Sequence, residues 1–208
     1  MAANAAAQPT RWARYKVQPS FVLAFHGCDE ATAEKVLAGK EHLKPSRKPY
    51  DWLGNGIYFW ESSPQRALEW AQEAALNPAK TVGSITKPTV VGAILDLGVC
   101  CNLFDSSALS EMATSYELLA WSLERAKTVM PKNVMGPDKV LRNLDCAVIE
   151  YMHGVRQDQA LLPYDTVRAA FGEGDKLYPN AGLTARNHIQ ISVRNTECIK
   201  GYFRPLEV

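Results

Sequence analysis

An imidazole and a phenol lie at the ends of two short apolar segments of the sequence. His26 follows residues 21–25, an apolar run typical of a buried strand, and a glycine comes next. Tyr58 lies in a second, aromatic segment, residues 57–60, directly after the glycine-rich turn 54–56. Because glycine has no side chain, a ligand can approach the backbone closely at such points. These parts could form a site for a flat ligand that carries a ribose.

A third polar residue occupies a similar position late in the chain. Gln190 lies between two isoleucines in the alternating segment 188–193, which predicts a strand. The residues before it, 172–187, contain three glycines and a proline and predict a long loop. Long loops inside a compact domain usually have a function. The register of the strand is open, so Asn187 or His188 could take the place of Gln190.

In chain order, these three segments resemble the three motifs of the histidine-tyrosine-glutamate ADP-ribosyltransferases. The first segment is Phe25-His26-Gly27, and the second is Gly54-x-Gly56-Ile57-Tyr58-Phe59 followed by a helix. The third is the strand around Gln190. This superfamily includes diphtheria toxin and the poly(ADP-ribose) polymerases. The matching segments cover roughly a third of the chain.

The resemblance implies an α+β fold, a split and twisted β-sandwich that binds NAD as a co-substrate between two small sheets. In the family, the histidine hydrogen-bonds the ribose of the nicotinamide half, and the backbone of the next glycine pairs with the nicotinamide amide. The tyrosine ring stacks on the nicotinamide. These roles fall here to His26, Gly27 and Tyr58. Ser46 and Tyr50, just before the second motif, are further candidates for nicotinamide contacts.

The third motif departs from the family pattern, because Gln190 stands where the family usually has a glutamate. Breaking the nicotinamide–ribose bond develops positive charge on the sugar, and a neutral amide supplies no anion to stabilise it. The departure favours transfer of a single ADP-ribose, weak activity, or an acidic group from elsewhere. Glu173, in the long loop, is the first candidate for that catalytic group, and Glu61 and Glu150 are others.

The rest of the sequence predicts a single domain over residues 19–208, after a poorly ordered N-terminus over 1–18. Two helices without a strand between them predict a helical insertion over about 104–154, folded onto the sheet. The other segments are read from periodicity and capping residues. Predicted helices are 30–38, 63–76, a long helix that starts at Ser107 or Ser110 and runs to about 129, and 138–152. Predicted strands are 90–97 and 199–203, and 164–171 is either strand or helix.

Composition narrows the classes of function. The chain has 208 residues and a formal net charge of +1, which gives no argument for nucleic acid or membrane as the main partner. Its five cysteines include no C-x-x-C pair and predict free thiols in a reducing compartment. For the neighbours Cys100 and Cys101, we expect one buried and one exposed residue. Since no run of about 18 apolar residues occurs, we expect a cytoplasmic protein.

These observations favour an NAD-dependent mono-ADP-ribosyltransferase that modifies a macromolecular acceptor, protein or nucleic acid. Such an enzyme could act as an intracellular toxin or modifier, with an antitoxin or regulatory partner. One alternative is an NAD glycohydrolase, in which water is the acceptor. Another is a catalytically inactive module of the same fold that binds NAD or a partner protein. We expect no metal, because His42 and His153 lack metal-ligand spacing.

Overall fold

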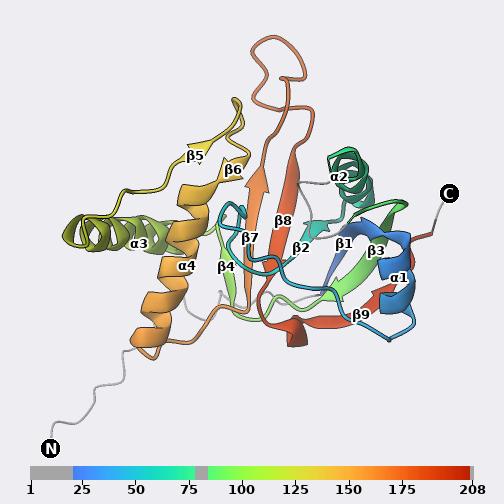
Figure 1. The fold of residues 1–208 in the computed structure, drawn as a ribbon, viewed down its shortest axis with the longest axis horizontal. Coiled ribbons are helices and arrows are strands. Elements are labelled where there is room, and N and C mark those ends of the chain that lie inside the picture. Colours follow the sequence, from blue (N-terminus) through green and yellow to red (C-terminus); the bar gives the residue numbers. More distant parts are fainter. Residues whose placement is uncertain (1–20, 78–83, 207–208) are drawn as a thin grey trace, which may run out of the picture.

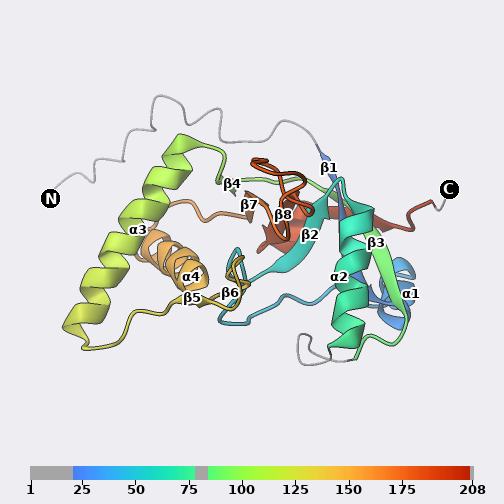
Figure 2. The same cartoon turned by 90° about the horizontal axis from the view of Figure 1, so that it is seen from above.

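The computed structural model describes residues 21–77 and 84–206, and these form one mixed β-sheet with helices on both faces (Figures 1 and 2). The sheet has seven strands in the order β4-β7-β8-β2-β1-β3-β9, of which only the β4–β7 pair is parallel. The strands are β1 (Val22–Asp29), β2 (Ile57–Glu61), β3 (Pro88–Leu95), β4 (Cys100–Asn102), β7 (Thr166–Phe171), β8 (His188–Val193) and β9 (Ile199–Phe203). The expected α+β class is confirmed.

Four helices and a small separate hairpin complete the described part of the chain. The hairpin pairs two short strands and lies above α3 and α4 in the view of Figure 1. These elements are α1 (Glu30–Leu37), α2 (Pro64–Leu76), α3 (Ser106–Arg125), α4 (Asn143–Asp158), β5 (Asn133–Val134) and β6 (Leu141–Arg142), with a 3₁₀ turn, η3, at Thr196–Cys198. None of the helices described is long and apolar enough to cross a membrane.

Successive residues of a strand point to opposite faces of the sheet, and this alternation separates two cores. On one face, here called the α1 face, Phe59 and Ile191 pack with Val36 of α1. On the opposite α2 face, Ala67 of α2 packs on Phe25 and Trp60. A third cluster on that face joins α3 and α4 to β4 and β7.

The expectation for the two neighbouring cysteines was wrong. Cys100 and Cys101 are both buried, 4% and 0% exposed, because β4 is covered on both faces. Cys100 belongs to the core of the α1 face, and Cys101 belongs to the cluster under α3 and α4. The periodicity of a short strand cannot tell which of its faces is covered, so only packing decided this point.

Helix ends follow the capping signals where these are strong. Asp29 caps α1 by accepting a hydrogen bond from the Ala31 N–H at 3.0 Å, as the sequence predicts. The helix expected over 138–152 was placed wrongly, because residues 141–142 pair with β5 and α4 begins only after them. Gly154 lies inside α4 rather than beyond its end. The segment 164–171, left open between strand and helix, contains β7.

All seven main strands belong to one sheet, so the expected pair of small sheets is not present as such. The sheet has a thin junction between β1 and β2, where only Ala24 pairs with Glu61 and Phe25 with Trp60. On its other edge, β1 pairs with β3 along its whole length. The region expected as a helical insertion, about 104–154, contains α3 and the start of α4, which pack on the sheet through the third cluster. The expectation that no strand lies between the two helices was wrong, because β5 and β6 do. The predicted N-terminal segment 1–18 lies outside the described residues.

Gly27 of β1 is required by the packing of α2. A Cβ at this position would lie 2.1 Å from the carbonyl oxygen of Ala67, a backbone atom that cannot turn away. The sequence suggests that this glycine leaves space for a ligand. The structure shows that its missing side chain also lets α2 pack closely on β1.

We predict that Gly27→Ala lowers the free energy of unfolding by at least about 2 kcal/mol, because β1 and α2 must separate to admit the methyl group. Urea unfolding followed by circular dichroism measures the change. Gly154→Ala is the matched control: a Cβ there meets no atom within 4 Å, and the residue lies inside α4. This variant should gain about 0.5–1 kcal/mol from helix propensity. Equal stabilities for the two variants would contradict the packing argument.

Candidate functional site

The pairing between β1 and β2 ends within the length of β1, before Gly27. The Ser62 N–H donates to the Leu23 carbonyl at 2.9 Å, so the backbone N–H and C=O of Leu23 point toward β2. Because these groups alternate in direction along a strand, every second residue after Leu23 also directs them toward β2. Phe25, the next residue of this set, lies opposite Trp60 in the last pair of the junction. Gly27 follows in the same set. Its N–H and C=O therefore point to the side of β2, beyond the point where pairing ends.

His26 occupies the place where the ladder would continue. Its Nδ1 lies 2.7 Å from the carbonyl oxygen of Tyr58, the group that a continued ladder would pair with Gly27. A carbonyl only accepts hydrogen bonds, so Nδ1 carries the proton. Burial lowers the pKa of His26, which favours the neutral ring. Nε2 is then left as a hydrogen-bond acceptor one residue from the Gly27 peptide.

The Tyr58 hydroxyl is used within its own turn. It donates to the Gly54 carbonyl at 2.6 Å and accepts from the Leu53 N–H at 2.8 Å, while burial raises its pKa well above the usual value. The ring packs on the α2 face with Trp52 and the third cluster. The hydroxyl therefore stabilises the glycine turn that begins β2, and only the ring remains to contact a ligand.

The side chains of His26, Tyr58 and Gln190 do not all lie on the same face of the sheet. The His26 ring lies on the α1 face, 5.7 Å from the ring of Phe59 between centroids. Tyr58 and Gln190 point to the α2 face, because Gln190 lies opposite Trp60 in the β2–β8 pair. What the first two motifs share is the junction, where the His26 imidazole meets the backbone of Tyr58.

Gln190 belongs to a group of buried side chains on the α2 face that we call the polar cluster. Five side-chain nitrogen or oxygen atoms of this group are buried without a hydrogen-bond partner: Trp60 Nε1, Arg66 Nε, Arg66 Nη1, His188 Nε2 and Gln190 Oε1. Most buried polar atoms in proteins are paired, so such a concentration needs an explanation. The members of the polar cluster are Trp60, Arg66, Glu173, His188 and Gln190.

Contacts connect the members of the polar cluster. The guanidinium of Arg66 lies 2.8 Å from a carboxylate oxygen of Glu173 and 6.0 Å from the ring centre of Trp60. Burial lowers the pKa of His188, the Glu173 carboxylate opposes this shift, and Arg66 and Arg142 reinforce it. Because Nδ1 of His188 lies 2.8 Å from the Arg186 carbonyl, Nε2 of the neutral ring is an acceptor. The structure thus brings Glu173 to the face that carries Gln190.

Ser46 and Tyr50 lie on the loop that leads into β2. Ser46 exchanges two backbone hydrogen bonds with Gly56, at 2.8 and 3.1 Å, and so fixes the entry of the strand. The Tyr50 carbonyl accepts from the Arg142 N–H at 3.3 Å, and its ring lies 5.7 Å from the Lys48 ammonium. These contacts give both residues a part in positioning the turn before Tyr58.

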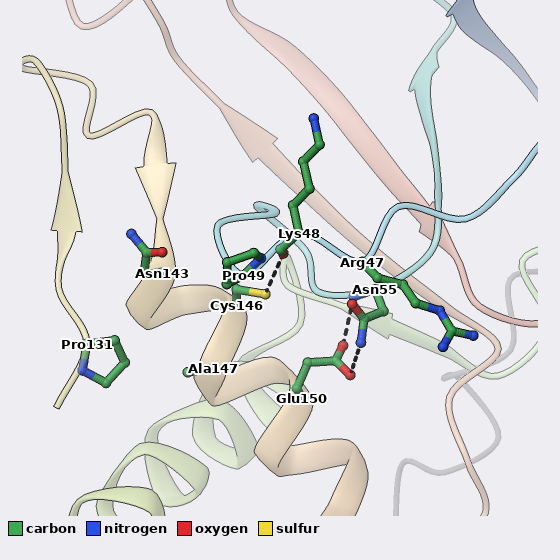
Figure 3. Close-up of a pocket in the computed structure, with 9 residues that line it drawn as sticks. All are labelled: Arg47, Lys48, Pro49, Asn55, Pro131, Asn143, Cys146, Ala147 and Glu150. Atoms are coloured by element: carbon green, nitrogen blue, oxygen red, sulfur yellow. Dashed lines mark hydrogen bonds between the residues drawn. The ribbon is translucent and has the colours of Figure 1, made fainter. Parts of the chain in front are cut away.

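The other acidic candidates are engaged in ion pairs. Glu61 binds Arg168 through two hydrogen bonds of 2.6 and 2.8 Å. Glu150 accepts from the backbone and side chain of Asn55 at 2.8 and 2.7 Å (Figure 3). It also forms an ion pair with Arg194. Glu150 therefore holds the glycine turn from α4. Neither carboxylate belongs to the polar cluster.

A cavity of about 380 Å³ lies beside this turn, between the loop at 47–49 and α4 (Figure 3). The Cys146 thiol at its wall contacts the Lys48 carbonyl at 3.5 Å, and burial raises the pKa of this thiol to about 11. The thiol is protonated at neutral pH and is a poor nucleophile. A second cavity, of about 480 Å³, adjoins His188 and Phe171 at the end of the β7–β8 hairpin.

Sequence reasoning did not find Arg66 or Trp60. Arg66 lies in the first turn of a helix with an alanine-rich face, where an arginine is usually exposed, yet it is only 6% exposed here. The sequence signal that could have pointed to Arg66 was the glutamate on the long loop. If Glu173 is buried, its carboxylate needs a cationic partner. In the described part of the chain, no group of three or more His, Cys, Asp or Glu side chains could hold a metal ion.

Comparison with known proteins identifies one relative without assigning a function. The chain is 28% identical over 196 residues to the uncharacterized protein MJ0359 of Methanocaldococcus jannaschii, covering 85% of this chain and 83% of the relative. No family model matches the sequence. No solved structure matches it either.

We predict that Tyr58→Phe destabilises the fold by about 1–3 kcal/mol, because the Leu53 N–H and the Gly54 carbonyl lose their partner. Tyr178→Phe, at a residue that is 60% exposed, is the control and should change stability by less than about 0.5 kcal/mol. Urea unfolding compares the two variants. A loss below about 0.5 kcal/mol for Tyr58→Phe would contradict the bracing role of the hydroxyl.

We also predict that acid destabilises the protein between pH 6.5 and 4. Burial lowers the pKa of His153 from 6.5 to about 4, and lowers those of His26 and His188 in the same direction. The unfolded state therefore binds protons first, and the free energy of unfolding falls as the pH falls through this window. Each histidine contributes a slope of at most about 1.4 kcal/mol per pH unit. His153→Gln should reduce the slope measured by urea unfolding, and an unchanged slope would contradict the assignment.

Proposed function

We propose that the protein is an NAD-dependent mono-ADP-ribosyltransferase that binds the nicotinamide end of NAD at the β1–β2 junction. The observation that carries the proposal is the His26 hydrogen bond to the Tyr58 carbonyl. The imidazole takes the carbonyl that would otherwise pair with Gly27. The Gly27 peptide, which has no partner residue in the β2 register, thus lies next to a neutral imidazole in the chain.

These two groups fit the two ends of a nicotinamide riboside. The Gly27 N–H and C=O match the carbonyl and amino groups of a carboxamide, which needs one donor and one acceptor. The acceptor Nε2 of His26 suits a ribose hydroxyl. Because the two motif side chains lie on opposite faces, the ligand must lie across the open edge between the strands. The Tyr58 ring would then contact the nicotinamide from the α2 face.

The proposed reaction is cleavage of the bond between the ribose C1′ and the nicotinamide nitrogen. The electron pair of that bond goes to nicotinamide, and positive charge develops on the sugar. A macromolecular acceptor then bonds to C1′ and loses a proton to solvent. Oriented hydrogen bonds at the ribose can stabilise this transition state without a covalent intermediate on the protein.

The thin junction supports the finer fold assignment that belongs to this proposal. With only two residue pairs between β1 and β2, the sheet is nearly divided into the two halves of a split β-sandwich. The five cysteines are buried and form no disulfide, which suits a reducing compartment, so the proposal includes a cytoplasmic location and an intracellular role as modifier or toxin.

NAD glycohydrolase activity is the second candidate, and the neutral Gln190 favours it. A carboxylate on that strand could orient and activate a macromolecular acceptor, whereas an amide cannot accept a proton. Water would then compete for the sugar. Nicotinamide release without labelled macromolecule, after incubation with NAD labelled in the ADP-ribose half, would select hydrolysis over transfer.

We predict that His26→Asn reduces nicotinamide release from NAD by about 100-fold, in the range typical for loss of one oriented group. The asparagine amide can still donate to the Tyr58 carbonyl, so the junction is kept while the Nε2 acceptor is lost. His42→Asn is the control, because His42 is exposed and lies outside the junction. The measurement is nicotinamide release by chromatography, with unfolding curves to confirm that both variants fold.

Three outcomes would overturn the proposal. Wild-type protein that neither binds NAD in calorimetry nor releases nicotinamide would exclude the reaction. Active wild-type protein with an equally active His26→Asn variant would exclude the junction as the site. NAD binding without turnover would replace the transferase with the inactive NAD-binding module.

A further inference from the structure

Two ion pairs tie the β7–β8 loop, residues 172–187, to α2. Glu173 binds Arg66 at 2.8 Å, and Arg186 binds Glu73 at 2.7 Å. The loop rises at the end of the sheet between the β5–β6 hairpin and α2, as both views show (Figures 1 and 2). Both ion pairs therefore join the same loop to the same helix, so their burial can be compared directly.

The two ion pairs differ in burial. The side chains of Arg66 and Glu173 are 8% and 11% exposed, whereas those of Arg186 and Glu73 are 43% and 34% exposed. A buried ion pair gains little stability over an apolar contact, because both charges lose their hydration. Attachment of the loop alone could be achieved by pairs such as Arg186–Glu73. The burial of the Arg66–Glu173 pair therefore suggests that the charge of one of these side chains acts on a ligand.

The surroundings of Glu173 suit a hydroxylated ligand. Among the atoms of the polar cluster that lack a hydrogen bond, those of Trp60 and Arg66 are donors, and those of His188 and Gln190 are acceptors. A hydroxyl group both donates and accepts, so it can satisfy either kind. A phosphate only accepts and would leave His188 and Gln190 unpaired. Trp60 also belongs to the last pair of the β1–β2 junction, which connects the cluster to the proposed site.

We propose that the β7–β8 loop supplies the site with the carboxylate that β8 lacks, with Glu173 as the catalytic group and Arg66 as its positioning residue. This inference rests on the proposed function. Arg66 orients the Glu173 carboxylate on the α2 face through a charge-assisted hydrogen bond. Glu61 and Glu150 pair with Arg168 and Arg194 outside the polar cluster, so of the three carboxylates only Glu173 lies among its unsatisfied atoms.

In this reaction, Glu173 remains a carboxylate throughout. The C1′–N bond breaks with its electron pair on nicotinamide, and the Glu173 carboxylate, from the α2 face, stabilises the positive charge that develops on the ribose. The acceptor forms the new bond to C1′ and releases its proton to solvent. Glu173 forms no bond to the sugar, so nothing beyond NAD and the acceptor is consumed.

The test uses Glu173→Gln, which keeps the size of the side chain and a hydrogen bond to Arg66 but removes the charge. We expect kcat for nicotinamide release to fall by about 100-fold, while the Kd for NAD changes by less than about threefold. Glu73→Gln, in the exposed pair, is the matched control and should keep the wild-type rate. Arg66→Lys should lower kcat less than Glu173→Gln does, because lysine keeps the charge but not the planar geometry of the guanidinium.

A charge swap separates catalysis from structure. The double variant Arg66→Glu with Glu173→Arg keeps an ion pair but moves the carboxylate to α2. If the pair only holds the loop, the swap should restore the rate lost in Arg66→Glu. If Glu173 acts on the ligand, the rate should stay low although the double variant regains stability in urea unfolding.

The outcomes distinguish this inference from the function on which it rests. A wild-type protein that releases no nicotinamide removes both. An active wild-type protein with a Glu173→Gln variant of at least half its kcat, or a fully active charge swap, overturns the inference alone and leaves the NAD reaction at the junction intact.

Discussion

The hydrogen bond between the His26 imidazole and the Tyr58 carbonyl is the contact on which the proposed site depends. An antiparallel ladder normally pairs every inward-directed backbone group, and an unpaired strand edge inside a sheet is costly. By taking the Tyr58 carbonyl, the imidazole ends the β1–β2 ladder after two pairs without leaving that acceptor unpaired. The ladder can therefore open at Gly27 while β1 remains fixed along β3.

Several remote contacts hold this junction in place. Glu150 and Arg194 fix the Asn55 backbone, and the Tyr58 hydroxyl bonds to Leu53 and Gly54 within the same turn. The helix α2 contacts β1 so closely that only glycine fits at position 27. The β1–β2 junction is thus held by contacts from α2, from Glu150 of α4 and from Arg194. A binding site needs such support, because small displacements of its groups weaken oriented hydrogen bonds.

The polar cluster has a different physical character. Its charges come from a loop and a helix that are 107 residues apart in sequence, and its amide and imidazole come from β8. Buried polar atoms without partners raise the free energy of the folded state. Proteins retain such atoms where a ligand completes their hydrogen bonds or where strain serves a function. The cluster and the junction meet at Trp60, which makes them two parts of one candidate site.

Local signals in the sequence determined much of the secondary structure. Alternating apolar residues marked β8, the capping residue Asp29 marked the start of α1, and Pro64 marked α2. These signals succeed because they act between neighbours along the chain. They failed for α4, since the strand pairing of residues 141–142 with 133–134 overrides a helical periodicity.

The sequence by itself determined which residues could do chemistry: a histidine before glycine, a tyrosine after a glycine turn, and a strand whose polar residue is an uncharged amide. Only the tertiary structure decided how they are used. It placed the His26 ring and the Tyr58 ring on opposite faces, and it brought Arg66 and Glu173 together under a long loop. The physical reason is that strand register and helix packing, which join residues far apart in the chain, set the direction of each side chain.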